Sequence, residues 1–299
     1  MTAATRICLL GFGEVGQVLA EDLRRRGVCD LSAWDLLFAD PTSLPSKGLS
    51  GSAVRAARSA ADAIAGATLV ISAVTAAECI AAATTAVQSI APGATFLDLN
   101  SVSPSTKATA AGALSRAGAR YVEAAVMSPI APQGIASPIL LGGPHAAAFL
   151  PLAQELGFVG TEVYSDVIGR ASAAKMCRSV MIKGIEALLT ESLVAARRYG
   201  VERTVLESLN GILPVGDWRS VSRYMISRSL QHGRRRAEEM REVASAVREA
   251  GLEPWMSLAC AERQEWAAAH AAARDNDSLD AILDGILLAI AAPHGTPTC

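Results

Sequence analysis

The sequence has few aromatic side chains and no long apolar run. Aromatic residues make up 4% of the 299 positions, although 51% are hydrophobic, so the core is expected to consist mainly of alanine, valine, leucine and isoleucine. Alanine is the best helix former, which favours a largely helical protein. No apolar run reaches the roughly 20 residues that cross a bilayer, and the opening MTAATRICLLG leads directly into a strand-like run without a cleavable signal. The sequence therefore predicts a cytoplasmic protein with no membrane partner.

The chain also lacks a large excess of charge of either sign and any clustered metal ligands. Its formal net charge is −2, whereas a nucleic-acid-binding protein is expected to have a clustered basic surface. No nucleic-acid partner is therefore predicted. The six cysteines are scattered without a C-x-x-C pair, and the four histidines have no ligand spacing among them. Neither a disulfide framework nor a metal site is predicted. The expected partner is a small-molecule substrate.

Short apolar runs alternate with alanine-rich helical stretches through the first half of the chain. The strand-like runs are RICLL, LSAWDLL, ATLVISAV, ATFLDLN, RYVEAAV and SPILLGG. Strands separated by helices of this length form right-handed βαβ units and a parallel sheet. After about Thr161 the strand signals stop, and residues 171–292 read as successive helices. We predict an α/β fold, with a doubly wound parallel sheet at residues 1–165 followed by an all-α domain at 166–299.

The fingerprint G-x-G-x-x-G occurs at Gly11, Gly13 and Gly16, directly after the apolar run Ile7–Leu10 and directly before the amphipathic segment Val15–Leu23. In a strand–loop–helix unit the first glycine permits the tight turn, the second lets the backbone approach a pyrophosphate, and the third lets helix and strand pack closely. The helix N-terminus adds free N–H groups and a positive dipole end. A glycine-rich turn without a ligand is the alternative, but the βαβ pattern that follows favours a Rossmann-type dinucleotide site. The expected cofactor contacts in this loop are Gly11, Phe12, Gly13, Glu14, Val15 and Gly16.

The residue that meets the adenosine ribose is expected at the end of the second strand, where the run LSAWDLL contains Asp35. A carboxylate there accepts hydrogen bonds from both ribose hydroxyls and repels a 2′-phosphate. No arginine or lysine lies between Leu36 and Ser46. We therefore predict NAD as the cofactor rather than NADP. Asp40 is a competing candidate if the strand is longer, and a solvated strand-end carboxylate is the alternative for Asp35.

Five motifs occur in one order along the chain: GFGEVG, LVISAVTAAE, FLDLNSVSPST, YVEAAVMSPI and IGRASAAKMCRSVMIKGIEALLTES. In this order they resemble the β-hydroxyacid dehydrogenase family, which includes 3-hydroxyisobutyrate dehydrogenase, tartronate semialdehyde reductase and 6-phosphogluconate dehydrogenase. The resemblance covers most of the chain. It implies hydride transfer between a nicotinamide cofactor and an alcohol. It also implies a homodimer, in which the helical domain packs against the partner subunit and helps to complete the cleft.

The resemblance implies roles for individual residues. The lysine that acts as general acid and base in the family falls on Lys175, in the small-residue setting ASAAKMC; a surface helix lysine is the alternative. Alcohol oxidation requires that the hydroxyl proton be removed as hydride leaves, and an amine tuned by burial does this near neutral pH. The family's cofactor contacts near the third and fourth strands fall on Val74, Thr75 and Asn100 to Ser103, where a turn or capping role is the alternative.

The sequence departs from the family pattern at two places that bear on the substrate. One turn beyond the lysine, where the family usually has an asparagine that holds the substrate hydroxyl, stands Ser179 beside Arg178. The family's substrate loop reads close to D-A-P-V-S-G-G, whereas this chain reads EAAVMSP from Glu123 to Pro129. The loop serine is replaced by Met127 or displaced to Ser128, and both glycines are absent. The candidate substrate contacts here are Met127, Ser128, Pro129, Arg178 and Ser179.

The basic stretch QHGRRRAEEMRE is predicted to lie on a helix of approximately Arg223 to Val247. In the resembling enzymes a helix of the second domain presents a basic residue to the cofactor cleft. His232 and Arg235 lie three residues apart and share one helix face, and arginine is suited to a bidentate hold on an anion. These two residues predict an anionic or aromatic acid substrate larger than hydroxyisobutyrate. The alternative is a solvated helix whose arginines pair with the glutamates between 238 and 242.

The sequence thus predicts an NAD(P)-dependent dehydrogenase or reductase that acts on the carbinol carbon of a 3-hydroxy acid or related anionic alcohol, with Lys175 as proton carrier. An imine reductase on the same fold is one rival, although such enzymes usually place aspartate or tyrosine at the lysine position. A decarboxylating dehydrogenase is a second rival, because a β-keto acid product loses CO₂ readily. A non-catalytic NAD-binding sensor is a third, since it would keep the GFGEVG loop and tolerate the altered substrate loop.

Overall fold

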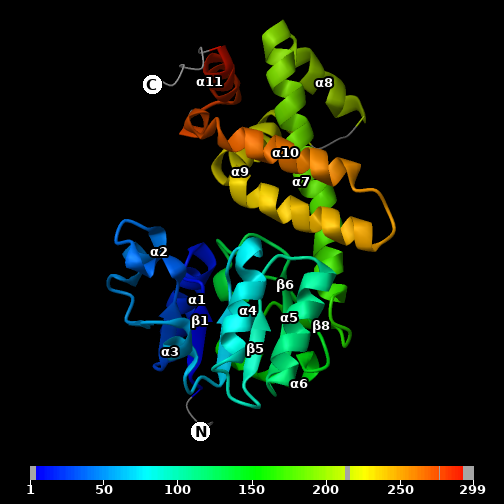
Figure 1. The fold of residues 1–299 in the computed structure, drawn as a ribbon. Coiled ribbons are helices and arrows are strands. Elements are labelled where there is room, and N and C mark those ends of the chain that lie inside the picture. The colour runs from blue at the N-terminus through cyan, green and yellow to red at the C-terminus, as the bar shows by residue number, and fades with distance from the viewer. Residues whose placement is uncertain (1–4, 213–215, 276, 292–299) are drawn as a thin grey trace, which may run out of the picture. The chain divides into compact units, whose positions relative to one another are not determined.

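The computed structural model describes residues 5–212, 216–275 and 277–291 (Figure 1). The chain divides into two compact units, Met1–Met176 and Cys177–Cys299, which are described separately below as the sheet unit and the helical unit. The described strands all lie in the sheet unit. The boundary falls inside the long helix α7 (Arg170–Tyr199).

The sheet unit is built around eight strands, in the spatial order β3 (Arg55–Ala56), β2 (Leu31–Trp34), β1 (Ile7–Leu10), β4 (Leu69–Ser72), β5 (Thr95–Asp98), β6 (Arg120–Val126), β7 (Ile139–Gly142) and β8 (Thr161–Ser165). Neighbouring strands run parallel except for β6 and β7, which are antiparallel. Within the β6–β7 connection the only helix is the short 3-10 turn η3 (Gly134–Ala136). That connection makes no helical crossover, so the chain returns antiparallel. The predicted doubly wound α/β fold is confirmed. The prediction of a parallel sheet is wrong for β7, which is antiparallel to β6, and the sequence did not predict strands β3 and β8.

Helices cover both faces of this sheet (Figure 1). They are α1 (Glu14–Arg25), α2 (Leu44–Leu49), α3 (Ala60–Ile64), α4 (Cys79–Val87), α5 (Pro104–Arg116), α6 (Ala146–Leu156) and the 3-10 helices η1 (Leu36–Ala39) and η2 (Ala76–Glu78). Successive strand residues point to opposite faces. Leu9 of β1 accordingly lies in a core with α1 and α6, whereas Leu10 lies in a second core with α3, α4 and α5. As the composition predicts, alanines supply much of the second core.

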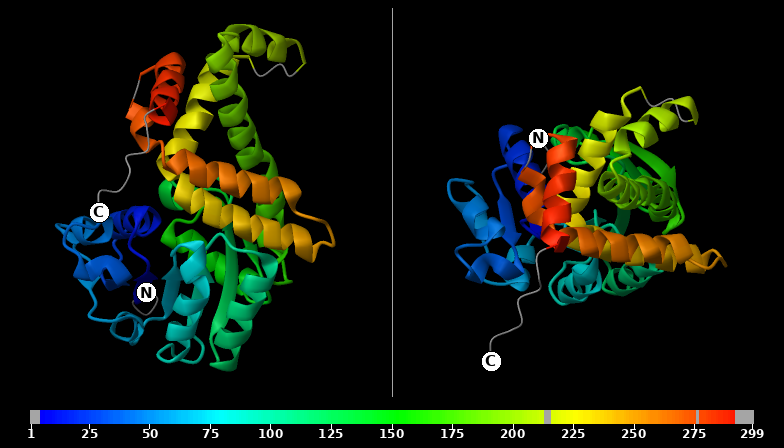
Figure 2. Two further views of the ribbon diagram at one scale, coloured as in Figure 1. Left: turned by 45° about the horizontal axis from the view of Figure 1, so that its top comes forward. Right: turned by 90° about the horizontal axis from the view of Figure 1, so that it is seen from above.

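The helical unit contains the rest of α7, α8 (Glu202–Ile212), α9 (Trp218–Glu249), α10 (Trp255–Ala268), the 3-10 helix η4 (Ala271–Asp275) and α11 (Leu279–Ala291). Its core joins residues of α7, α9 and α11, among them Leu193, Ile226 and Ile282. Helices α9 and α10 lie side by side (Figure 2). They approach closely at Gly233, where a Cβ atom would lie 2.3 Å from the Gln264 carbonyl oxygen. The predicted all-α second domain is confirmed.

Among the described helices, none is long and apolar enough to cross a membrane.

Candidate functional site

The glycine-rich loop joins β1 to α1, and the space around its glycines fits the three predicted roles. Gly11 has a φ of +92°, and a Cβ atom there would lie 2.4 Å from the Ala73 carbonyl oxygen. At Gly16 a Cβ atom would lie 2.2 Å from the Gly11 carbonyl oxygen. Gly13 differs, because nothing lies within 4 Å of a Cβ built on it. It is also the N-cap of α1, and as a glycine it contributes no side-chain capping bond. The N-terminus of α1 is therefore open to an anionic ligand at Gly13.

Asp35 follows β2 and is bonded directly to this loop. One carboxylate oxygen, Oδ2, accepts a hydrogen bond of 2.7 Å from the buried backbone N–H of Phe12, and Oδ1 accepts one of 2.9 Å from Leu37. The carboxylate therefore sits beside the loop residues expected to meet the cofactor. The carboxylate of the competing candidate, Asp40, instead accepts hydrogen bonds from the backbone and side chain of Thr42 in its own turn. Hydrogen bonds from the side chain and backbone of Thr42 hold the pKa of Asp40 below its usual value.

The turn after β4 is held by the side chain of Asn100, which follows β5. Its Oδ1 accepts a bond of 2.8 Å from the Val74 N–H, and its Nδ2 donates to Ser72 Oγ at 2.9 Å. Asn100 is 4% exposed, so these internal bonds use most of its side chain. Thr75 lies next to Val74 and is the N-cap of η2. In this structure Asn100 orients the turn that carries the predicted cofactor contacts Val74 and Thr75.

Three polar side chains stand in register on neighbouring strands: Ser72 and Asp98 are the last residues of β4 and β5, and Glu123 lies in the middle of β6. All three are buried. Tyr121 donates to Asp98 Oδ2 at 2.7 Å, and burial followed by the nearby Asp98 charge raises the pKa of the Tyr121 hydroxyl. Sequence reasoning did not single out Asp98 or Glu123 as functional, although each is the one acidic residue inside an apolar run.

Lys175 lies on the first turns of α7 and reaches the same edge of the sheet. Its Nζ donates a hydrogen bond of 2.6 Å to the Oγ of Ser101, the residue after Asn100. The lysine is half-buried. The sequence placed Ser101 only within a range of cofactor contacts, and its pairing with Lys175 appears only in the fold. A primary amine and a hydroxyl are thus joined at the end of β5.

The segment after β6 also lies at this edge, because the parallel strands β1, β4, β5 and β6 all end there. Met127 and Ser128 are half-buried and Pro129 is exposed. Met127 N–H donates to the Pro138 carbonyl oxygen at 2.8 Å. The segment is tied to α1 by Asp22, whose Oδ2 accepts a bond of 2.9 Å from the Ile135 N–H. One edge therefore collects the glycine loop, the turns after β4 and β5, Lys175 and the predicted substrate loop.

Arg178 and Ser179 lie on the part of α7 that belongs to the helical unit. Arg178 is exposed, whereas Ser179 is only 5% exposed. The residue one turn beyond the lysine therefore offers little accessible surface. Contact of either side chain with a substrate stays a prediction.

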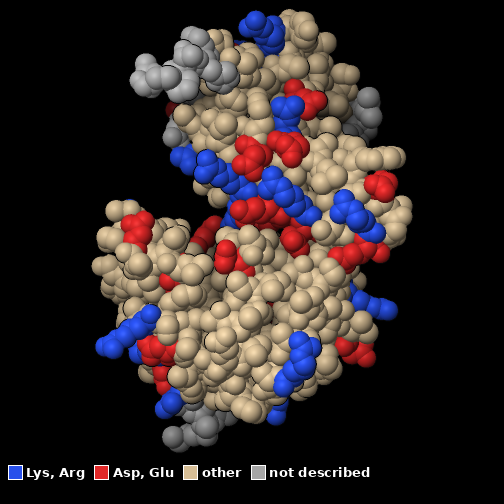
Figure 3. All heavy atoms as spheres, in the orientation of Figure 1, with Lys and Arg blue, Asp and Glu red and all other residues tan. Residues whose placement is uncertain are grey.

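The predicted substrate residues of the basic run have neighbours on α9 itself, whereas Arg236 is buried and pairs with Glu186 of α7. His232 Nε2 lies 2.9 Å from a guanidinium nitrogen of Arg228, and Arg235 Nε lies 3.9 Å from Glu239 Oε1. The second pair is of the kind expected for a solvated helix. Basic and acidic side chains are intermingled on the face shown in Figure 3. Binding of a substrate anion by His232 and Arg235 stays a prediction.

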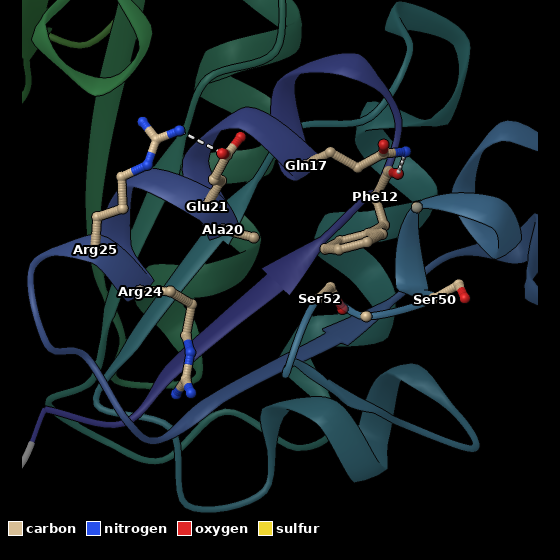
Figure 4. Close-up of a pocket in the computed structure, with 10 residues that line it drawn as sticks. Phe12, Gln17, Ala20, Glu21, Arg24, Arg25, Ser50 and Ser52 are labelled. Atoms are coloured by element: carbon tan, nitrogen blue, oxygen red, sulfur yellow. Dashed lines mark hydrogen bonds and ion pairs between the residues drawn. The ribbon is translucent and has the colours of Figure 1, made fainter.

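A pocket of about 420 Å³ opens on the flank of α1 (Figure 4). Of the predicted site residues, Phe12 alone lines it. Its polar side chains serve the protein itself: Gln17 Nε2 donates to the Phe12 carbonyl oxygen at 2.9 Å, and Arg24 donates to the Val28 carbonyl oxygen at 3.1 Å. Apart from Phe12, the pocket shares no lining residue with the candidate site.

Comparisons with known proteins bear on both units. A family model described as the NAD binding domain of 6-phosphogluconate dehydrogenase matches residues 6–169. A second model, described as a domain of unknown function (DUF1932), matches residues 196–267. None of the curated proteins matches the chain.

Solved structures are similar over nearly the whole chain. A conserved hypothetical protein from Sinorhizobium meliloti 1021 is 38% identical, with 95% of this chain and 96% of that chain covered and a TM-score of 0.71. A Mycobacterium tuberculosis 3-hydroxyisobutyrate dehydrogenase with L-serine is 18% identical, with 95% and 99% covered and a TM-score of 0.70. A reductive aminase from Aspergillus terreus with NADPH and ethyl levulinate is 21% identical, with 95% and 100% covered and a TM-score of 0.56. The last two likenesses show a shared fold.

Proposed function

This chain belongs to the β-hydroxyacid dehydrogenase family, and from that premise we propose that it is an NAD-dependent oxidoreductase acting on a hydroxy acid or related anionic alcohol. The observation that carries the proposal is the hydrogen bond of 2.6 Å between Lys175 Nζ and Ser101 Oγ. This bond supports a role for Lys175 as general acid and base, because it lies at the edge of the sheet where the glycine loop and the turn after β4 also lie.

The residues of the loop fit a dinucleotide. Open space at Gly13, the N-cap residue of α1, suits a pyrophosphate, whose charge the helix dipole stabilises. When bound, the nicotinamide cofactor supplies the site that accepts or gives up hydride. The chain's part is to hold the phosphates at α1 and to present the turn at Val74 and Thr75.

The preference for NAD rests on Asp35. Its carboxylate lies beside Phe12, and we expect it to accept hydrogen bonds from both ribose hydroxyls while its charge repels a 2′-phosphate. No lysine or arginine occurs from residue 36 to residue 46 to bind such a phosphate. NADPH is the cofactor named with the Aspergillus terreus reductive aminase, so the two cofactors must be compared directly.

Lys175 is proposed to move the proton. In the oxidation direction the amine takes the hydroxyl proton of the substrate as the carbinol C–H bond breaks, and in reduction the ammonium returns it. Ser101 accepts a hydrogen bond from Nζ and so holds it at a fixed place at the end of β5. The substrate anion is proposed to lie near Met127, Ser128 and Pro129.

The second domain, residues 166–299, is proposed to complete the substrate site and to form a homodimer. Exposed apolar side chains of the helical unit favour a partner surface: Leu252, Trp255, Met256 and Leu288 are 65%, 75%, 63% and 73% exposed. Sedimentation analysis of the purified protein tests this, and a monomer at micromolar concentration would contradict it.

The test of function is NADH formation over a panel of hydroxy acids, phosphorylated alcohols and aromatic alcohols, with wild type, Lys175→Ala and Lys47→Ala. Lys47 is an exposed lysine of α2 and serves as the matched control. We expect turnover to fall by about 100-fold or more in Lys175→Ala, with NAD affinity kept, and to be unchanged in Lys47→Ala.

Undiminished turnover in Lys175→Ala would remove the lysine from the mechanism. Tight NAD binding with no turnover on any alcohol, but with reduction of a ketone in the presence of an amine, would instead favour an imine reductase.

A further inference from the structure

The N-cap residue of helix α7 has no side chain that could cap the helix. The Gly169 carbonyl oxygen accepts the first helical bond, of 2.9 Å, from Ala173, so Gly169 is the N-cap. Its φ is +93°, and a Cβ atom there would lie 3.1 Å from Pro104 Cβ, which favours glycine. A usual N-cap side chain accepts a bond from the N–H three residues on, and a glutamate at that position reaches back to the N-cap N–H. Here the N-cap has no side chain and the third residue is Ser172.

The buried carboxylate of Glu123 supplies both missing bonds. Its Oε2 accepts a bond of 2.6 Å from the Gly169 N–H, and its Oε1 accepts one of 2.5 Å from the Ser172 N–H. Glu123 is fully buried on β6. Its register partner on β7 is Gly142, where a Cβ atom would lie 2.7 Å from Oε2. The neighbouring strand therefore leaves room for this carboxylate.

A buried carboxylate is costly unless hydrogen bonds and positive charge compensate it. Two N–H groups and the positive end of the α7 dipole do so here. The same two bonds fix the first turn of α7 relative to β6, both in its position along the helix axis and in its rotation about that axis. Because Glu123 is in register with Asp98 of β5, the turn is fixed against the strand that leads to Ser101.

Lys175 lies three residues beyond Ser172, about 4.5 Å further along the helix axis. The position of its ammonium against Ser101 therefore depends on where the first turn of α7 is held. We propose that Glu123 is a positioning residue that sets the place of Lys175 Nζ at the end of β5. This inference rests on the proposed acid and base role of Lys175.

The test replaces Glu123 by glutamine, which keeps one acceptor but turns an NH₂ group toward the other backbone N–H. Glu162→Gln is the matched control, because Glu162 is an exposed carboxylate on β8 of the same sheet. Trace acetylation of each lysine is measured by mass spectrometry as a function of pH, with the exposed Lys47 as internal reference. Amide hydrogen exchange of residues 169–173 is measured in parallel.

In Glu123→Gln we expect the pH profile of Lys175 acetylation to move while that of Lys47 does not. Exchange in the first turn of α7 should rise about tenfold, because a charge-assisted hydrogen bond is lost. We expect kcat to fall by about 10- to 100-fold with NAD affinity unchanged, as for a small misplacement of a catalytic group. Glu162→Gln should match wild type in every readout.

An unchanged acetylation profile for Lys175 in Glu123→Gln would overturn the inference, whatever the activity. Failure of the proposed function is a distinguishable result, because it would appear as undiminished turnover in the Lys175→Ala variant. If Glu123→Gln does not fold, Gly142→Ala provides the second variant, since its methyl group displaces the carboxylate while keeping its charge. An unmoved Lys175 profile in that variant would overturn the inference in the same way.

Discussion

Lys107 and Asp98 form an ion pair inside the sheet unit, with 2.9 Å between Nζ and Oδ1 and 1% of each side chain exposed. The Lys107 ammonium also donates to the Asp98 carbonyl oxygen at 2.9 Å, and the backbone N–H of Asn100 donates to Oδ1 at 2.9 Å. The pair thus joins α5 to the end of β5. Through its bond with Asp98, Asn100 is held in place, and the Asn100 side chain in turn holds the turn at Val74.

Replacing Lys107 by methionine should strongly destabilise the sheet unit. The substitution leaves the Asp98 carboxylate buried without its cation, which costs about 3–5 kcal/mol in comparable cases. Urea unfolding followed by circular dichroism measures the loss. Arg55→Met is the control, because it removes an ion pair with Asp62 whose side chains are 50% and 41% exposed, and such pairs contribute below about 1 kcal/mol. Equal losses in the two variants would contradict the prediction.

Two glycines of the loop should separate folding from cofactor binding. Gly13→Ala meets open space, so stability should change by no more than about 1 kcal/mol, the range of an N-cap effect. The added methyl group should nevertheless weaken NAD binding by about tenfold, equal to about 1.4 kcal/mol, by blocking the approach of the pyrophosphate. Gly16→Ala places a methyl group against a backbone oxygen and should cost about 1–3 kcal/mol of stability.

Thermal unfolding and titration of cofactor fluorescence measure the two effects for each variant. A Gly13→Ala protein that binds NAD as tightly as wild type would show that the pyrophosphate does not approach at this glycine.

Asp35→Asn should relax the preference for NAD. The amide keeps an oxygen to accept the Phe12 N–H but loses the charge that repels a 2′-phosphate. We expect the ratio of NAD to NADP affinity to fall by about tenfold, or about 1.4 kcal/mol. Titration with both cofactors measures it. If Asp40→Asn changed this ratio and Asp35→Asn did not, Asp40 would be the ribose contact.

The stability of the helical unit should depend on pH through Arg197. This residue of α7 bonds to Asp284 of α11 at 2.7 Å and to Glu202 of α8 at 2.6 Å. The Arg197 hydrogen bonds lower the pKa of Asp284, and a backbone hydrogen bond together with Arg197 lowers that of Glu202. Carboxyls with a lowered folded pKa stabilise the protein above their unfolded pKa of about 4 and lose this contribution as pH falls through the folded pKa.

Arg197→Ala should therefore lower the melting temperature near pH 7, and its deficit relative to wild type should shrink toward about pH 3. Differential scanning calorimetry at both pH values measures the change. Arg203→Ala is the control, because its pair with Glu207 is 85% and 66% exposed. A deficit that stays constant with pH would show that Arg197 acts through packing alone.

The sequence was sufficient for the fold class and for the position of the glycine loop, because both depend on local patterns. Apolar runs alternate with helical stretches, and Gly11, Gly13 and Gly16 stand at fixed spacing after the first strand. It was not sufficient for the direction of β7. The run SPILLGG reads the same in a parallel or an antiparallel strand, and the length and course of the preceding connection decide between them.

By itself the sequence determined the α/β architecture, the helical second half and the location of Lys175 within a family motif, since hydrophobic periodicity and motif order are properties of neighbouring residues. Only the tertiary structure decided what Lys175 meets. Ser101 lies 74 positions away from it in sequence. Glu123 lies 46 and 49 positions from Gly169 and Ser172, whose N–H groups donate hydrogen bonds to its carboxylate. Such pairs form because parallel strands bring their carboxyl ends to one edge of the sheet, which no local pattern records.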